Sequence, residues 1–262
     1  MATVADILKY IESIAPSYMA EDWDKIGVNC GRMNRQVKKI LVALDPFPHV
    51  CREAVERGAD LLVTHHPLVW EDGFITDATT QGMCILELLE NGIAHISAHT
   101  NLDCAPGGVN DTLALALGLK NVDVIDPKGT DEDGRIWGLM RIGDAETQPL
   151  ETFLAAVKTA LHCDGLRYVD GGKPVSRVAV GGGACGSELR SAAKAGCDTF
   201  VTSDVKYNQF WDGKELGINI IDAGHFHTEN PVCAVLAQKL SAKFPEVDVQ
   251  LSPNHWDCVK YC

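Results

Sequence analysis

Hydrophobic and polar residues alternate with two different periods along the chain. Near the N-terminus the apolar positions have helical spacing and fall on one face. Thr3 precedes them as a candidate N-cap, and Asp6 occupies the capping-box position. We therefore predict a helix whose buried face carries Val4, Ile7, Leu8, Ile11 and Ile14.

Two segments of similar pattern indicate an internal duplication. Residues 37–66 align without a gap with residues 175–204, at an offset of 138 (204 − 66). Both segments predict a strand, a helix, a turn at Gly58 or Gly196 where a C-cap is expected, and a second strand. The alternative is that unrelated β-α-β units converge on one pattern. The gapless match favours duplication.

A second match follows in the same order. Residues 90–100 resemble residues 215–225 at an offset of 125 (225 − 100), and each predicts a helix end, a Gly turn and a strand. Each half is then β-α-β-α-β, which implies parallel strands, a doubly wound sheet and the α/β class. The most loop-like stretch, 126–136, marks the join, so we expect one half in 1–125 and the other in 126–262.

Three further elements complete the predicted fold. A helix within 106–119 ends at Gly118, a strand covers 137–142, and another helix covers 150–161.

Composition restricts the setting of the protein. The net charge of −13 argues against general affinity for nucleic acid or anionic membranes. No apolar stretch has the length of a membrane span, and the N-terminal residues lack a signal-peptide layout. The ten cysteines are scattered without a CxxC pair, so we expect reduced thiols in a cytoplasmic protein.

Histidines and carboxylates gather where predicted strands end. In open parallel sheets, ligands bind beyond these carboxyl ends. The four groups are His65–His66, HTNLD with His99 and Asp103, SDVKYN at 203–208, and GHFHTE with His225, His227 and Glu229.

These residue types suit divalent metal ions. Imidazole and carboxylate without thiolate favour zinc, manganese or iron. Neighbouring residues of an extended chain point to opposite faces, so His65 and His66 suit two different ions better than one. On a helical turn His225 and Glu229 share a face, and a glutamate there can bridge two ions. We predict a two-metal set with open positions for water and substrate, consisting of His65, His66, Asp103, His225 and Glu229.

Other polar residues have less specific interpretations. His99 and His227 suit a ligand, a residue that orients a ligand, or an acid–base group. The Gly-rich stretch 181–188 suits a tight strand–helix turn better than a nucleotide loop, because it lacks GxGxxG and GK[ST]. Ordinary structural roles are expected for His49, His95, His162 and His255.

Five motifs together resemble the Nif3-like dinuclear-metal family, known in part as GTP cyclohydrolase 1 type 2 homologs. They are EDWDKIGVNCG (21–31), GADLLVTHHPLVW (58–70), HTNLDCAPGGVND (99–111), GCDTFVTSDVKYN (196–208) and IDAGHFHTEN (221–230). They span nearly the full length in the expected order.

The resemblance implies a three-layer α/β/α fold of two intertwined, pseudo-symmetric halves with mostly parallel sheets. It also implies a homohexamer, with metal sites facing its inner cavity. The family's metal ligands fall on the same five residues. Two positions depart from the family pattern: Ser203–Asp204 replaces a Gly-acid pair, and no histidine lies near Tyr207–Asn208.

Two classes of function remain open. One is a metal-dependent hydrolase with two divalent ions. The resemblance implies GTP as its substrate, with His99 or His227 as proton shuttle. A phosphoesterase is the alternative hydrolase. The other is a non-enzymatic metal-binding or regulatory interaction protein. We expect a small-molecule substrate, with a nucleotide as the candidate, and neither a membrane partner nor general nucleic-acid binding.

Overall fold

The computed structural model describes residues 1–262 and divides into two compact units. The first unit contains Met1–Leu102 and Cys233–Trp256, and the second contains Asp103–Val232 and Asp257–Cys262. The chain passes between them within helix α4 (Thr100–Cys104), near the start of helix α10 (Pro231–Lys243), and again between Trp256 and Asp257. The division in the structure therefore falls at 102/103, whereas the sequence-based join at 126–136 lies inside the second unit.

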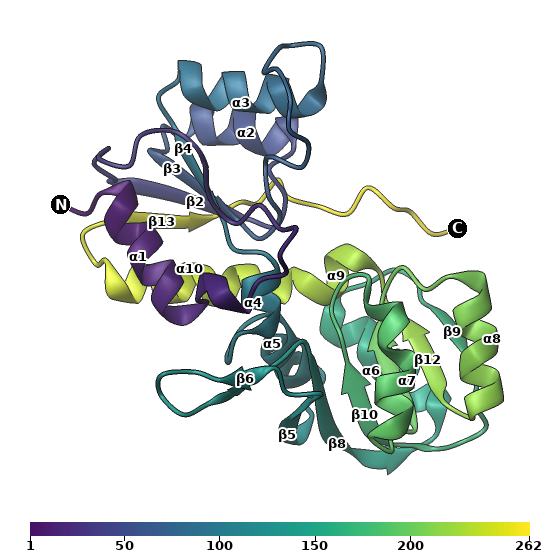
Figure 1. The fold of residues 1–262 in the computed structure, drawn as a ribbon. Helices are drawn as coiled ribbons and strands as arrows, with labels where there is room; N and C mark the ends of the chain where they lie inside the picture. The colour runs from purple at the N-terminus through teal and green to yellow at the C-terminus, as the bar shows by residue number, and fades with distance from the viewer. The chain divides into compact units, whose positions relative to one another are not determined.

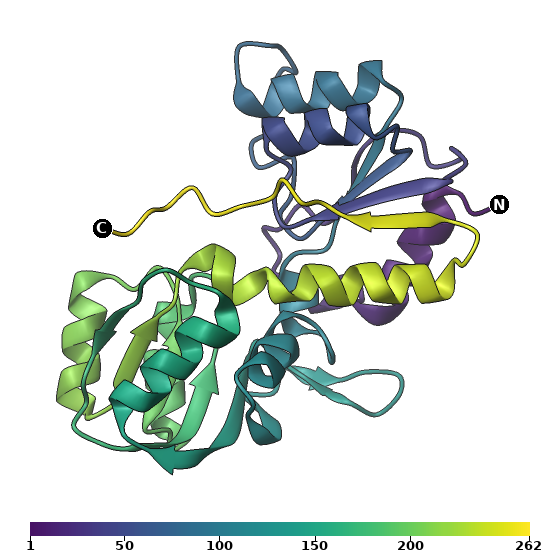
Figure 2. The ribbon, with the colours of Figure 1, turned by 180° about the vertical axis from the view of Figure 1, so that it is seen from behind.

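A five-stranded sheet with the order β1-β4-β3-β2-β13 forms the centre of the first unit. Its strands are β1 (Gly27–Cys30), β2 (Lys39–Ala43), β3 (Leu61–Thr64), β4 (Ala94–Ser97) and β13 (Asp248–Leu251). Helices α2 (Pro48–Glu56) and α3 (Thr80–Glu90) cover one face, and their apolar side chains form a core with Leu41 and Leu62. Helices α1 (Val4–Ile14) and α10 run along the other face (Figures 1 and 2).

The second unit has a six-stranded sheet with the order β5-β8-β10-β11-β12-β9. Its strands are β5 (Lys120–Ile125), β8 (Met140–Gln148), β9 (Arg167–Val169), β10 (Val175–Val180), β11 (Thr199–Thr202) and β12 (Asn219–Asp222). One face packs against α5 (Val109–Ala116) and α6 (Leu150–Leu161). The other face packs against α7 (Leu189–Lys194) and α8 (Tyr207–Leu216).

The predicted α/β class is confirmed, with antiparallel strands beside the parallel ones, including β8 between β5 and β10. The runs β2-α2-β3-α3-β4 and β10-α7-β11-α8-β12 both occur, and each set of three strands is parallel. Strand β1 pairs antiparallel with β4, and β9 pairs antiparallel with β12. The sheets are therefore mixed rather than purely doubly wound.

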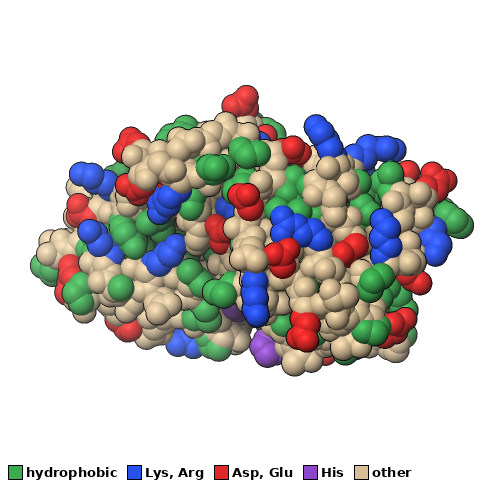
Figure 3. Space-filling model, turned by 90° about the horizontal axis from the view of Figure 1, so that it is seen from below, with side chains coloured by type: hydrophobic (Ala, Val, Ile, Leu, Met, Phe, Trp, Pro, Cys, Tyr) green, Lys and Arg blue, Asp and Glu red, His purple; other side chains and the backbone are tan.

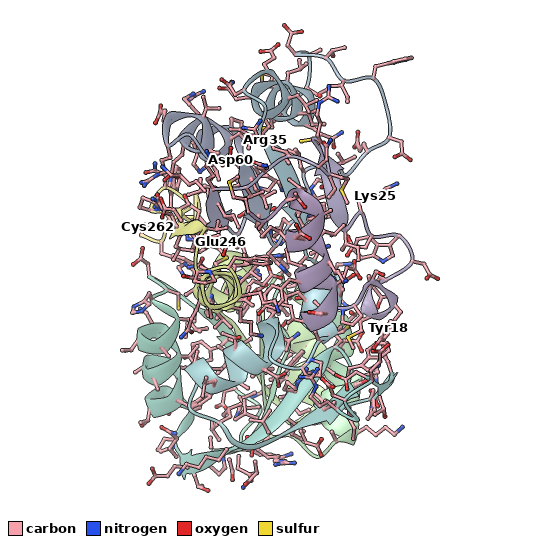
Figure 4. All side chains as sticks on the ribbon, turned by 90° about the vertical axis from the view of Figure 1, so that its left-hand side faces the viewer. Tyr18, Lys25, Arg35, Asp60, Glu246 and Cys262 are labelled. Atoms are coloured by element: carbon pink, nitrogen blue, oxygen red, sulfur yellow. The ribbon has the colours of Figure 1, made fainter.

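Matching hydrogen bonds repeat the duplication in the structure. The carboxylate of Asp60 accepts from the backbone N–H of Lys39, and that of Asp198 accepts from the N–H of Arg177. Both pairs are related by the offset of 138 found in the sequence (198 − 60 and 177 − 39). The two aspartates differ in one respect. Asp60 also forms an ion pair with Arg35, at 2.9 Å (Figure 4), and Asp198 forms no such pair with an arginine.

Several local predictions hold and one strand extends further than expected. The capping box of Thr3 and Asp6 is present, and α6 spans Leu150–Leu161 as predicted. The 126–136 loop contains a short hairpin of β6 (Gly129–Thr130) and β7 (Ile136–Trp137). Strand β8 continues to Gln148, because its polar end still pairs with Val175 at the start of β10. The apolar pattern alone cannot show this pairing.

The surface carries charged side chains of both signs, and the cysteines are not cross-linked. Basic and acidic side chains are interspersed on the face drawn in Figure 3. The ten cysteines form no disulfide. None of the helices combines the length and the apolar character needed to cross a bilayer.

Candidate metal centre

Three imidazoles converge in the first unit. His65 and His66 follow β3, and His99 follows β4, which lies beside β3 in the sheet. Their ring centroids are 5.0 to 5.4 Å apart, and one ring nitrogen from each lies within 4.8 Å of the others. The strand ends at Thr64, so His65 and His66 occupy a bend. Because the chain is not extended in this bend, adjacent side chains need not point to opposite faces. The rings of His65 and His66 therefore lie next to each other, and the expected opposite orientation is absent.

Each of these rings has its Nδ1 held by an oxygen. His65 Nδ1 lies 2.8 Å from the carbonyl oxygen of Ala98, and His66 Nδ1 lies 2.6 Å from Asp45 Oδ1. His99 Nδ1 lies 2.9 Å from Asp24 Oδ1. Because these oxygens can only accept, each Nδ1 carries the proton, and the Nε2 of the neutral ring has the lone pair that a metal requires.

Buried polar groups fix the bend that carries the tandem histidines. The Thr64 hydroxyl donates to the carbonyl oxygen of His66 at 2.6 Å. It therefore accepts from Nε2 of His95, which lies 2.7 Å away. Complete burial lowers the pKa of His95 to about 3, so this ring is neutral at physiological pH. His95 thus has the structural role that the sequence predicted.

The second unit presents a histidine and a glutamate on one helical turn. Strand β12 ends at Asp222, and α9 (His225–Glu229) follows Gly224, whose φ is +86°. The predicted turn is confirmed, and His225 Nε2 lies 3.0 Å from Glu229 Oε2. His225 Nδ1 lies 2.7 Å from Asp204 Oδ2. The ring is therefore oriented in the same manner as those of the first unit.

Asp103 lies close to Glu229 within this unit. A carboxylate oxygen of each lies within 4.8 Å of the other, and both side chains are buried. The fully buried Asn110 donates from Nδ2 to the Asp103 carbonyl oxygen at 3.2 Å. Its Oδ1 accepts from the N–H of Gly182 at 2.7 Å. Asn110 thus links the Asp103 backbone to the turn after β10.

That turn approaches the two α9 residues so closely that only glycine fits. Gly183 has φ +64°, and a Cβ built there would overlap Glu229 Oε1 and lie 3.2 Å from His225 Nε2. The Gly183 N–H donates to the Thr228 hydroxyl at 3.0 Å. The stretch 181–188 is therefore the tight strand–helix turn that we predicted, and it also confines the Glu229 carboxylate.

The donor atoms of each unit are of the types that bind a divalent metal ion. They are imidazole nitrogens and carboxylate oxygens, which suit zinc, iron and manganese. The nearby thiol of Cys185 donates to the Gly182 carbonyl oxygen. Burial, and further the charges of Asp103 and Glu229, raise the pKa of this thiol well above its usual value.

Two further histidines, His227 and His255, have partners outside these clusters. His227 Nδ1 lies 3.2 Å from the Leu161 carbonyl oxygen, and its Nε2 lies 3.3 Å from Asp257 Oδ2. Its role as an acid–base group stays a prediction. His255 accepts from the N–H of Leu44, which is a structural contact.

Sequence reasoning missed the residues that orient the histidines. These are Asp24, Asp45 and Asp204, each bonded to one Nδ1. A signal did exist, because one residue separates Asp45 from the end of β2, and one residue separates Asp204 from the end of β11. Both therefore lie at strand carboxyl ends, although neither is close in sequence to the histidine it contacts.

Comparisons with known proteins show the family and the fold to which the chain is similar. The family model described as Duf34/NIF3 (NGG1p interacting factor 3) matches residues 2–257. A Clostridium perfringens protein named GTP cyclohydrolase 1 type 2 homolog is 36% identical over 240 residues, covering 91% of each chain. A Streptomyces coelicolor protein of the same name is 34% identical, covering 98% of this chain and 90% of that one. The solved Bacillus cereus protein related to NIF3 superposes with a TM-score of 0.92 at 27% identity, covering 100% and 99%.

Proposed function

Because the chain belongs to the Duf34/NIF3 family, we propose that it binds two divalent metal ions and acts as a metal-dependent hydrolase on a nucleotide. The proposed ligands are His65, His66, Asp103, His225 and Glu229. Relatives named GTP cyclohydrolase 1 type 2 homolog suggest a purine nucleotide as the substrate class. The predicted homohexamer and the cytoplasmic location stay predictions.

The observation that carries the proposal is the orientation of the imidazoles. In His65 a backbone carbonyl holds Nδ1, and in His66 and His225 a carboxylate does. Metal-binding histidines use this arrangement, because the partner fixes the ring and makes Nε2 more basic. Three rings oriented in this way at strand ends are difficult to explain by packing alone.

The chain's own residues then have distinct tasks. Asp103 and Glu229 supply negative charge that offsets the ions, and their burial strengthens this attraction. His99 is held by Asp24 and can accept or donate a proton at Nε2. Divalent ions held by these residues would make water a better nucleophile at neutral pH and would polarise the group under attack.

The metal proposal is tested by elemental analysis of purified protein after metal supplementation and desalting. We expect about two equivalents of divalent metal in the wild type and a loss of bound metal in Glu229→Gln and His66→Asn. The exposed Glu151→Gln and His162→Asn are matched controls and should keep the wild-type content. Less than one equivalent in the wild type, or unchanged content in both site variants, would contradict the proposal.

The hydrolase proposal needs a separate measurement. Metal-loaded protein is incubated with GTP, other nucleotides and phosphoesters, and the products are identified by mass spectrometry. We expect turnover of a nucleotide that is lost in His66→Asn and kept in His162→Asn. Absence of turnover in fully loaded wild type would instead favour a non-enzymatic metal-binding role.

A further inference from the structure

Two half-exposed tryptophans flank the histidine cluster of the first unit. Trp23 is 59% exposed and Trp70 is 51% exposed. The Trp23 ring meets His99 edge-to-face at 5.9 Å between centroids, and Trp70 meets the same ring at 5.4 Å. Trp70 also lies 6.4 Å from His66. Large aromatic faces are therefore open to solvent directly beside polar imidazole edges.

Hydrogen bonds hold the two segments that carry these rings. The Asn29 side chain donates to the carbonyl oxygen of Lys25 at 2.8 Å and accepts from the N–H of Leu68 at 2.7 Å. Lys25, labelled in Figure 4, also forms an ion pair with Asp72 at 3.2 Å. The residues just after Trp23 are thus tied to those on both sides of Trp70.

Each tryptophan has a further anchor in the backbone next to it. Asp24 binds the Nδ1 of His99 and the N–H of Thr100, both at 2.9 Å. The side-chain oxygen of Gln81 accepts from the N–H of Trp70 at 2.8 Å. The backbone that carries the two rings is consequently held in place, which lowers the entropy lost when a ligand binds upon them.

We propose that Trp23 and Trp70 form a stacking site for a planar nitrogen heterocycle, specifically a nucleobase. The inference rests on the proposed function, since it names the part of the substrate that lies beside the metal ligands. An indole face stacks on any planar π system, and the Nε2 of His99, which the proposed ligand set does not use, can hydrogen-bond the polar edge of a base. An aliphatic ligand would use the indole faces but leave this nitrogen without a role.

Calorimetric titration of the full-length protein, with and without zinc, tests the proposal. The probes are guanosine, GMP and ribose 5-phosphate, which lacks a base. We expect guanosine and GMP to bind and ribose 5-phosphate to bind far more weakly. Trp70→Ala and Trp23→Ala should each weaken guanosine binding about tenfold, while Trp70→Phe keeps most of it because it retains an aromatic face. Trp211→Ala removes a ring that is 56% exposed in the second unit and should change nothing.

Three results would overturn the stacking site. They are undetectable guanosine binding in both metal states, equal affinity in Trp70→Ala and wild type, and equal affinity for GMP and ribose 5-phosphate. Melting temperature and metal content of each tryptophan variant show that the fold and metal ligands are intact. Guanosine binding without zinc is measured independently of metal content and turnover. Failure of the proposed function is therefore distinguishable from failure of this inference.

Discussion

At the scale of single residues, the candidate site depends on which ring nitrogen each histidine leaves available for a metal ion. An imidazole can bind a metal through either nitrogen, and the partner of the other nitrogen decides between them. In His66 this partner is Asp45, and in His225 it is Asp204. The ligands were predictable because they stand at strand ends. Their partners were not, because each lies 21 residues away in sequence and is brought close only by the folding of the sheet.

Replacing Asp45 should weaken metal binding without removing a ligand. In Asp45→Ala the His66 ring loses the bond that fixes Nε2, and we expect metal affinity to fall about 10- to 100-fold. Asp45→Asn keeps an accepting oxygen and should retain more affinity. Competition with a chromophoric chelator measures both constants, and the exposed Asp77→Asn is the control. If Asp45→Ala binds metal as tightly as Asp77→Asn, His66 is not oriented through Asp45.

At the scale of elements, the turn after β10 confines a ligand carboxylate. The carbonyl oxygen of Gly183 accepts from the N–H of Ser203 at 3.0 Å and from its hydroxyl at 2.6 Å, which holds the turn to the end of β11. The sequence predicted a turn here, since three glycines precede a helix. It could not predict which side chain the turn approaches, because α9 lies about 40 residues further along the chain.

A methyl group at this turn should disturb the metal site more than the fold. Gly183→Ala places a Cβ against Glu229 Oε1 and also suffers the strain of φ +64°, about 1–2 kcal/mol. Gly196→Ala suffers the same kind of strain at φ +81°, but its Cβ has nothing within 4 Å. We expect both to lower the free energy of unfolding and only Gly183→Ala to lower metal affinity. Denaturant unfolding and chelator competition separate the two effects. Equal metal affinity in the two variants would show that Glu229 is not confined by the turn.

At the scale of the whole molecule, the duplicated halves have diverged at the positions that carry chemistry. Where the first copy has His65–His66, the second has Ser203–Asp204. Asp204 orients His225, whereas its counterpart His66 is a proposed metal ligand. The repeated architecture was predictable, because it follows from hydrophobic period and Gly turns. The division between units was not, because residues 103–125 supply α5 and β5 to the second unit through contacts distant in sequence.

Burial of a neutral histidine should make global stability depend on pH. The folded pKa of His95 is about 3, whereas the unfolded chain has the ordinary value near 6.5. Below about pH 6.5 the unfolded state binds a proton that the folded state does not, so the stability present above that pH is lost as pH falls toward 3. The loss from this residue approaches about 1.4 kcal/mol per pH unit.

His95→Gln removes this titration while keeping a donor for the Thr64 hydroxyl. We expect the variant to be less stable than wild type near pH 7, because the amide fits the fully buried ring site poorly. The gap should shrink by about 2–3 kcal/mol on going to about pH 4.5, because protonation of His95 in the unfolded chain lowers the stability of the wild type alone. Urea unfolding in the presence of a chelator measures the free energy at each pH and keeps metal binding from contributing. His162→Asn changes an exposed histidine whose φ of +53° asparagine tolerates, so its gap to wild type should be constant with pH. A difference in unfolding free energy between His95→Gln and wild type that stays constant with pH would mean that His95 is protonated in the folded protein at the lower pH. The Thr64–His95 bond would then hold the histidine bend without requiring a neutral ring.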